Sequence, residues 1–444
     1  MRRHRHKSVL FLIGLFSMTE IHVGGFIGIS ELVLFLIAPF VFIQDLPLLR
    51  RDGFMPFLWL VFLTLGGCTV ASLANHTPIP FFMRGFSAVY ALFACSVCLH
   101  RLLRNDLTGV RWVVLGYCFS LIINIFIFQR GASRHGGDVA IMSAAAMQST
   151  SESVLFWTQR GIAWLYAPIK CWYEKVPKWY VLPAAFAAIA VCLFGSGGSG
   201  RAAALCATMT FVLLWIGASD VRRLKFMQKN LWLIILCAIG AALVFKMAYQ
   251  HFATTGALGE AGLKKYEGQT KGGKGMLAMI MSGRGEFFSG AYAAAQKPII
   301  GYGPWAVDWN GIEGSFIIKY GSSEDYELYS RKRVRDFARG RLPMVPGHSF
   351  IVGFWVWYGI FGLMLWMYVL WLLWRVFSSC LSVSPPLFGF LACTMPLMVW
   401  DIFFSPFGAR IMNSLTIVVC LFLQAAVRGR VRVGGVGINN LTWR

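Results

Sequence analysis

The sequence has few charged residues for its length, and few of these are acidic. Only 14% of the 444 residues are Asp, Glu, Lys or Arg, whereas soluble domains average about 25%. Hydrophobic residues make up 57% of the chain, and the mean hydropathy is +0.62. These proportions exclude an ordinary soluble protein and predict an all-α integral membrane protein, because a helix satisfies its own backbone groups in lipid.

Acidic residues number 19 against 41 Lys and Arg, which gives a net charge of +22. Much of the positive charge lies in short segments between apolar runs, where Lys and Arg set the orientation of a membrane protein. The basic balance therefore describes topology, and it does not indicate a nucleic-acid partner.

The sequence also lacks the patterns of a disulfide framework, a metal site or a cleaved leader. The eleven cysteines lie in or beside apolar segments, and Cys95-x-x-Cys98 is typical of helix packing. No His-Glu-x-x-His or paired acidic motif is present, so we expect neither a metal nor a cofactor. The apolar run after Arg2, Arg3, Arg5 and Lys7 has no small-residue cleavage site and predicts an uncleaved first helix.

Eleven apolar runs are long enough to cross a bilayer, which takes about 20 residues. They lie near residues 8–24, 26–45, 54–74, 81–100, 108–129, 179–197, 201–219, 230–250, 347–374, 386–405 and 408–427. Basic clusters and the basic tail should lie on the same side of the membrane as the N-terminus. Eleven spans do not allow this, so one more is required, and it is best placed at about 145–170. The prediction is about twelve spans: nine in residues 1–250, a loop with short helices at 251–346, and three more with a basic tail in 347–444.

The segment from 251 to 345 is the one long stretch too polar for a bilayer. Nine predicted spans precede it, so it is expected on the outer side, opposite the N-terminus. It holds 13 Lys and Arg against nine Asp and Glu. Positive charge that topology does not require favours an anionic ligand, although a solvated loop with charges of both signs remains an alternative.

Arg201 follows a run of glycines and serines and opens an apolar helix on the same predicted side. The glycines would let a phosphate approach backbone N–H groups closely. Alternatively, an arginine at the membrane edge extends to lipid headgroups.

Arg284 is flanked by glycines, with Glu286 two residues on. A guanidinium group can hold a phosphate through two parallel hydrogen bonds. The competing interpretation is a surface ion pair of little energetic value.

His348 precedes an apolar helix, directly after Pro346 and Gly347. It could accept a proton from a sugar hydroxyl, or it could contact a headgroup. Gly301 and Gly303 predict a tight turn, and nearby Trp305 could stack on a sugar ring or belong to an interfacial aromatic belt.

In this order, the motifs resemble the O-antigen ligase and O-antigen polymerase family of bacterial membrane glycosyltransferases. The resemblance covers the C-terminal half and rests on these segments: Gly198-Ser199-Gly200-Arg201, Ser282-Gly283-Arg284, Gly301-x-Gly303, and His348 followed by Trp357-Tyr358-Gly359-Ile360-Phe361-Gly362. Gly200 and Ser349 depart from the serine and asparagine that are common in the family at these positions.

The resemblance implies a fold like that of the C-type glycosyltransferases in the bacterial inner membrane, with both termini cytoplasmic and a periplasmic active site. It implies metal-independent, inverting transfer of a glycan from undecaprenyl diphosphate to a lipid A core sugar. Arg201, Arg284 and His348 would be the catalytic residues, and Glu286, Gly301, Gly303 and Trp305 would help to bind substrate.

Three other functions stay open. A polymerase would join lipid-linked repeat units, with another lipid-linked glycan as acceptor. A polysaccharide flippase or other transporter could have as many helices, although no repeated halves are evident. A structural assembly protein is disfavoured because Arg201, Arg284 and His348 fall on one predicted side.

Overall fold

The computed structural model of the chain describes residues 2–17, 20–22, 26–126, 285–320, 323–338, 344–345, 347, 349–380, 385–404 and 410–428, with isolated positions between 209 and 263. Helices account for most of these residues. Four helical segments in the described part are long and apolar enough to cross a membrane: α2 (Ile29–Arg51), α3 (Met55–Ala74), α4 (Ile79–Leu103) and the Ile360–Phe377 part of α18 (Ile360–Cys380). A mostly helical membrane protein is therefore confirmed. The count of about twelve spans stays a prediction, and the expected helix at 145–170 lies outside the described residues.

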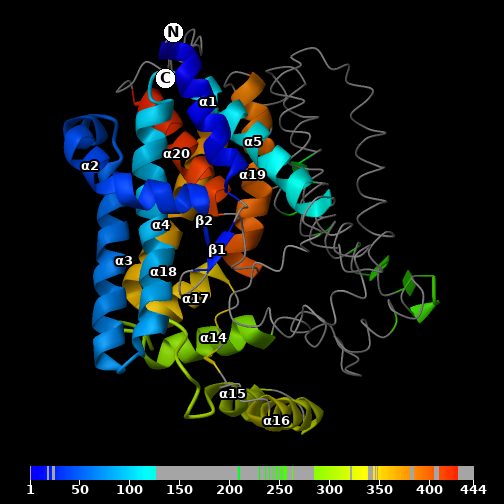
Figure 1. The fold of residues 1–444 in the computed structure, drawn as a ribbon. Helices are drawn as coiled ribbons and strands as arrows, with labels where there is room; N and C mark the ends of the chain where they lie inside the picture. Colours follow the sequence, from blue (N-terminus) through cyan, green and yellow to red (C-terminus); the bar gives the residue numbers. More distant parts are fainter. Residues whose placement is uncertain are drawn as a thin grey trace.

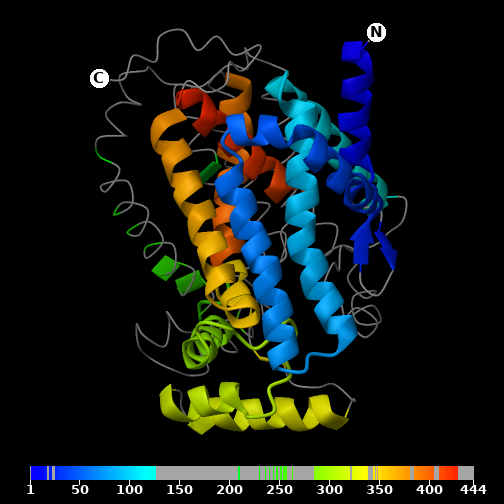
Figure 2. The same cartoon turned by 90° about the vertical axis from the view of Figure 1, so that its left-hand side faces the viewer.

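The core of the molecule is a bundle in which α3, α4 and α18 run side by side around α20 (Arg410–Val427), with α19 (Pro385–Phe404) beside them (Figures 1 and 2). Side chains on every face of α20 are buried, from Ile411 to Gln424. Most of these residues are apolar, and a helix with apolar side chains on every face is stable only inside other structure, which agrees with its central place.

The N-terminal segment differs from the two predicted spans at 8–24 and 26–45. The helix α1 (Arg2–Leu15) ends early, and strands β1 (Glu20–His22) and β2 (Phe26–Gly28) form an antiparallel hairpin after it. A carboxylate and an imidazole are costly in a lipid-facing span, which accounts for the helix ending before Glu20 and His22. The α2 helix then lies across the bundle, steeply inclined to α3 and α4 (Figures 1 and 2).

Glycines allow α1 to cross α5 (Val110–Phe126) at close range. The short helix η1 (Leu107–Gly109) precedes α5. A Cβ atom on Gly14 would collide with the backbone of Val113, and one on Gly116 with the backbone of Phe11. Small residues at such a crossing let two helix backbones approach, which is a common device in membrane proteins.

Three helices from the predicted loop cover one end of the bundle, and we call them the cap: α14 (Gly285–Gln296), α15 (Ile312–Tyr320) and α16 (Ser323–Ala338). Figure 1 shows the cap at the end opposite the start of α1 and the end of α20. None of the three belongs to the four candidate spans.

The predicted span at 347–374 is broken into α17 (Phe350–Tyr358) and α18. Gly359, between them, has φ +65°, a conformation that glycine adopts without strain. Its amide donates to the Trp355 carbonyl, and the next amide, that of Ile360, donates out of the helix to Ile299 at 3.1 Å. The backbone of a loop thus occupies the break.

Candidate functional site

The turn at residues 301–305 lies where the cap meets the bundle. The Tyr302 amide donates to the Val356 carbonyl on α17 at 2.7 Å. Gly301 and Gly303 have φ of +79° and +84°, in agreement with the tight turn predicted for them. The turn therefore joins the loop to the broken helix through backbone hydrogen bonds.

Both glycines of this turn allow close packing against helices. A Cβ atom on Gly301 would lie 2.7 Å from the Gly359 nitrogen and the Val356 oxygen. A Cβ atom on Gly303 would collide with the Thr77 hydroxyl. Gly301 thus lets two backbones approach, and Gly303 lets the turn pack on the Thr77 side chain. Contact of either glycine with substrate stays a prediction.

A polar group at the end of α3 fixes the same turn from the other side. Asn75 donates from Nδ2 to the Gly301 carbonyl at 3.2 Å, and its Oδ1 accepts from Lys297 Nζ at 2.8 Å. Lys297 Nζ also lies 4.8 Å from the centroid of the Tyr302 ring. Burial, and to a lesser degree the Asp308 carboxylate, raises the pKa of Tyr302. The phenol thus stays neutral beside an exposed lysine.

Two tryptophans stack at the side of the turn. Trp305 and Trp357 have ring centroids 4.6 Å apart with planes 21° from parallel, and both side chains are half-buried. Trp305 has φ +50°, which is unusual for a bulky residue and costs about 1–3 kcal/mol. The predicted sugar-stacking residue therefore belongs to a stacked aromatic pair that is only partly buried.

The described residues before His348 lie against Trp357 and Ala306, and the residue after it caps α17. Gly347 packs on the ring of Trp357. Just before it, the Val345 amide donates to the Ala306 carbonyl at 2.9 Å. Ser349 follows as the N-cap of α17, with its hydroxyl accepting from the Val352 amide at 3.0 Å.

The described neighbours of Arg284 lie in the cap. Gly285 begins α14, which packs against α17. Arg201, Arg284 and His348 themselves lie outside the described residues. Glu286 belongs to the first turn of α14, but the structure does not describe its side chain. Gly285 thus begins one helix and Ser349 caps another, and these two helices touch.

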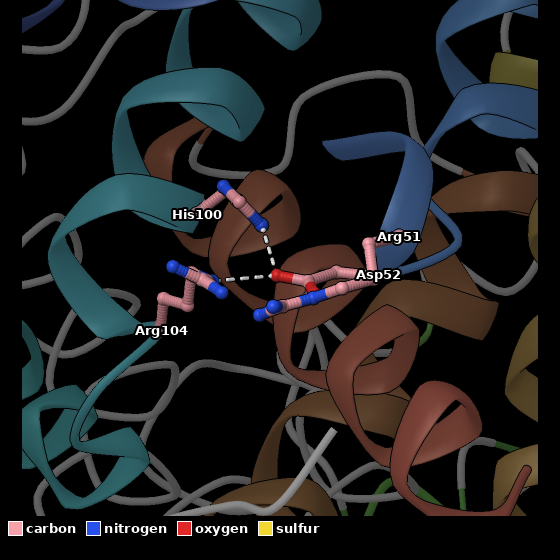
Figure 3. A network of polar contacts seen from close by, with 4 residues as sticks. All are labelled: Arg51, Asp52, His100 and Arg104. Carbon is pink, nitrogen blue, oxygen red and sulfur yellow. Dashed lines mark hydrogen bonds and ion pairs between the residues drawn. The ribbon is translucent and has the colours of Figure 1, made fainter. Parts of the chain in front are cut away.

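A second polar group, at the far end of the bundle, was not among the predicted sites. Asp52 is fully buried between α2 and α3 and accepts three hydrogen bonds (Figure 3). The donors are Arg104 Nε at 2.8 Å, His100 Nε2 at 2.9 Å and Arg51 Nε at 3.3 Å. A buried carboxylate needs such partners, because an unpaired one costs several kcal/mol.

The ring of His100 is fixed by its surroundings. It stacks on Phe422 with planes 7° apart and meets Phe54 edge-on. Because Asp52 only accepts, Nε2 carries the hydrogen, and Nδ1 is buried with no partner among the described residues. One feature of the sequence indicates this group: Asp52 directly follows Arg50 and Arg51 at the end of an apolar run.

Among the described residues, no group of three or more His, Cys, Asp or Glu side chains is placed to hold a metal ion. No family model, curated protein or solved structure matches the chain.

Proposed function

We propose that the protein is a membrane glycosyltransferase that moves a glycan from a polyprenyl diphosphate, of the undecaprenyl type, to a sugar hydroxyl on a lipid A core. This is the activity that the order of sequence motifs implies. The observation that carries the proposal is the meeting of α14, which begins directly after Arg284, with α17, which begins directly after His348 and Ser349. The Trp305–Trp357 pair lies beside the same segment.

The proposed chemistry assigns one role to each charged residue. Arg201 and Arg284 hold the diphosphate and stabilise the negative charge that develops as the glycosidic bond breaks. His348 orients or deprotonates the acceptor hydroxyl. In-line attack inverts the anomeric carbon, and polyprenyl diphosphate leaves. The cap helices limit access of water, which would otherwise hydrolyse the donor.

The aromatic pair suits a sugar substrate. A flat indole face attracts the C–H face of a pyranose, and the Trp305–Trp357 stack leaves part of its surface exposed. Exposed Lys297, anchored to Asn75, adds positive charge at the same end of the bundle. A donor that joins an anionic diphosphate to a sugar would meet both kinds of group.

The test is a transfer assay with the purified full-length protein in nanodiscs. A lipid-diphosphate oligosaccharide is supplied with a lipid A core acceptor or without one, and chelator is present throughout. Product on the core acceptor alone supports the ligase. A ladder of longer lipid-linked chains without the acceptor would replace it with the polymerase. No product in either arm from folded protein would overturn the transferase and favour the transporter.

Substitutions then test the assigned residues. Arg284→Ala should lower the turnover rate at least about 100-fold, because removal of one transition-state donor has this effect in other enzymes. Arg201→Lys should be strongly impaired, since lysine keeps the charge but loses the two-pronged hydrogen bond. Arg331→Gln is the matched control, because Arg331 is exposed on α16 and pairs only with Glu327 among the described residues. Near-normal turnover in both test variants would remove the diphosphate role.

A further inference from the structure

The α2 helix presents an apolar stripe that ends in arginine, at the end of the bundle away from the cap. Leu36, Phe40 and Ile43 are 67%, 69% and 72% exposed, and Pro47 and Arg50 continue the same face. We call these five residues the α2 stripe. Their spacing of three or four residues puts them on one side of a helix, and the other side packs against α4.

Two further arginines are held at the end of this stripe by the buried Asp52. Both Arg51 and Arg104 bind Asp52 through Nε (Figure 3). Their terminal nitrogens have no hydrogen-bond acceptor within the described part of the chain. The side chains of Arg51 and Arg104 are 58% and 21% exposed. Asp52 thus orients two guanidinium groups whose outer edges remain open.

Among the described residues at this end of the bundle, arginines outnumber carboxylates. Asp52 is shared by Arg51 and Arg104, while Asp45 and Gln44 engage Arg101. Arg50 is exposed and adds a further positive charge. One phosphate group would reduce the repulsion between neighbouring guanidinium groups and accept paired hydrogen bonds from them.

We propose that this end of α2 binds the headgroup of an anionic phospholipid, with the phosphate against Arg51 and Arg104 and the acyl chains along the α2 stripe. A row of exposed apolar side chains leading to fixed guanidinium groups matches a molecule that joins hydrocarbon to phosphate. Membrane orientation alone requires positive charge at this end of the helices. It does not require a buried carboxylate that holds the arginines in place.

The test measures which lipid the full-length protein retains. Protein purified in neutral detergent is titrated with dioleoylphosphatidylglycerol or with dioleoylphosphatidylcholine, and bound lipid is counted by native mass spectrometry. We expect the anionic lipid to bind at lower concentration. Arg51→Gln should weaken its binding about fivefold, and Arg50→Gln with Arg51→Gln about 25-fold, because each arginine near a lipid surface contributes about 1 kcal/mol.

A matched double variant separates a local site from net charge. Lys319→Gln with Arg331→Gln removes two exposed charges from the cap, at the opposite end of the bundle. It should leave retention of phosphatidylglycerol unchanged. Equal loss in this control, or equal retention of the two lipids by the unsubstituted protein, would overturn the proposal. Displacement of phosphatidylglycerol by inorganic phosphate at similar concentration would show a site for free phosphate and overturn the lipid assignment.

Discussion

Gly303 shows how a single glycine joins the cap to the bundle. Its positive φ and its contact with Thr77 on the connection between α3 and α4 exclude any larger side chain without movement. The Gly-x-Gly pattern was sufficient to predict a turn, because glycine supplies the conformations that tight turns need. It could not reveal Thr77, more than 200 residues away in the sequence.

Gly303→Ala should therefore destabilise the protein by about 2–3 kcal/mol through backbone strain and the collision with Thr77. The measurement is thermal unfolding of the purified protein. Gly66→Ala is the control, because Gly66 lies in α3 with nothing within 4 Å of an added Cβ. Similar melting temperatures for the two variants would contradict the packing role.

Asp52 was missed because the positive-inside rule counts arginines without regard to what they bind. The carboxylate is buried and holds Arg104 and His100, so its loss leaves charged and polar groups without a partner. Asp52→Asn should cost about 3 kcal/mol, as the breaking of a buried pair generally does.

Asp45→Asn is the comparison for Asp52→Asn. Asp45 faces Arg101 at 3.4 Å, and the side chain of that arginine is 48% exposed. Asp45 is buried, but it has one long contact with a half-exposed arginine, whereas Asp52 accepts three hydrogen bonds, so Asp45→Asn should cost less than Asp52→Asn. Denaturant unfolding of both variants measures the difference, and equal destabilisation would show that Asp52 matters no more than Asp45.

At the scale of elements, the sequence predicted where apolar helices occur better than where they break. The spans at 54–74 and 81–100 agree with α3 and α4, because hydropathy measures composition over a window. The break at Gly359 and the hairpin at residues 20–28 were not predicted. The break depends on the positive φ of Gly359 and on Ile299, which is distant in sequence. The hairpin depends on local backbone pairing between β1 and β2.

The N-cap of α17 offers a test of how an element orients its neighbour. Ser349→Ala removes the hydroxyl that accepts from Val352 and should destabilise the protein by about 1 kcal/mol. Because His348 adjoins this cap, we expect the turnover rate of glycan transfer to fall further than stability alone explains. Ser349→Thr keeps the hydroxyl and should recover most of the rate. Failure of threonine to recover it would count against the cap as the cause.

The aromatic pair provides a second test at this scale. Trp305→Ala should weaken donor binding about tenfold, measured as a rise in KM for the lipid-linked glycan, because an aromatic contact contributes about 1 kcal/mol or more. Trp309→Ala is the control, since Trp309 is 67% exposed and outside the stack. A change in turnover without a change in KM would indicate that the pair positions the chain near His348 instead of binding sugar.

For the whole molecule, the structure supports a two-ended arrangement, with the cap at one end and the start of α1 and the end of α20 at the other (Figure 1). The basic clusters predict that the termini and the cap lie on opposite sides of a membrane, and this sidedness stays a prediction. The full number of spans depends on residues 127–208 and on most of 209–284, which the structure does not describe.

Labelling of single introduced cysteines from either face of sealed cells tests this arrangement. Arg331→Cys on α16 should react with a membrane-impermeant thiol reagent from outside, because Arg331 is exposed on the cap. Arg428→Cys, just after α20, should react only after permeabilisation. The unsubstituted protein measures background labelling; among the described residues its cysteines are buried. Reaction of both variants from one face would contradict the arrangement.

Contacts between α3 and the region around the break between α17 and α18 can form only late in synthesis. Asn75 binds Gly301, which lies 226 residues later, and the Thr64 hydroxyl meets the Phe361 carbonyl 297 residues later. At about 5–20 residues per second, a ribosome needs roughly 11–45 seconds to make the shorter of these stretches. The surfaces of α3 and α4 that later contact these residues therefore have no native partner at first. They remain accessible to the insertion machinery until the last third of the chain has been made.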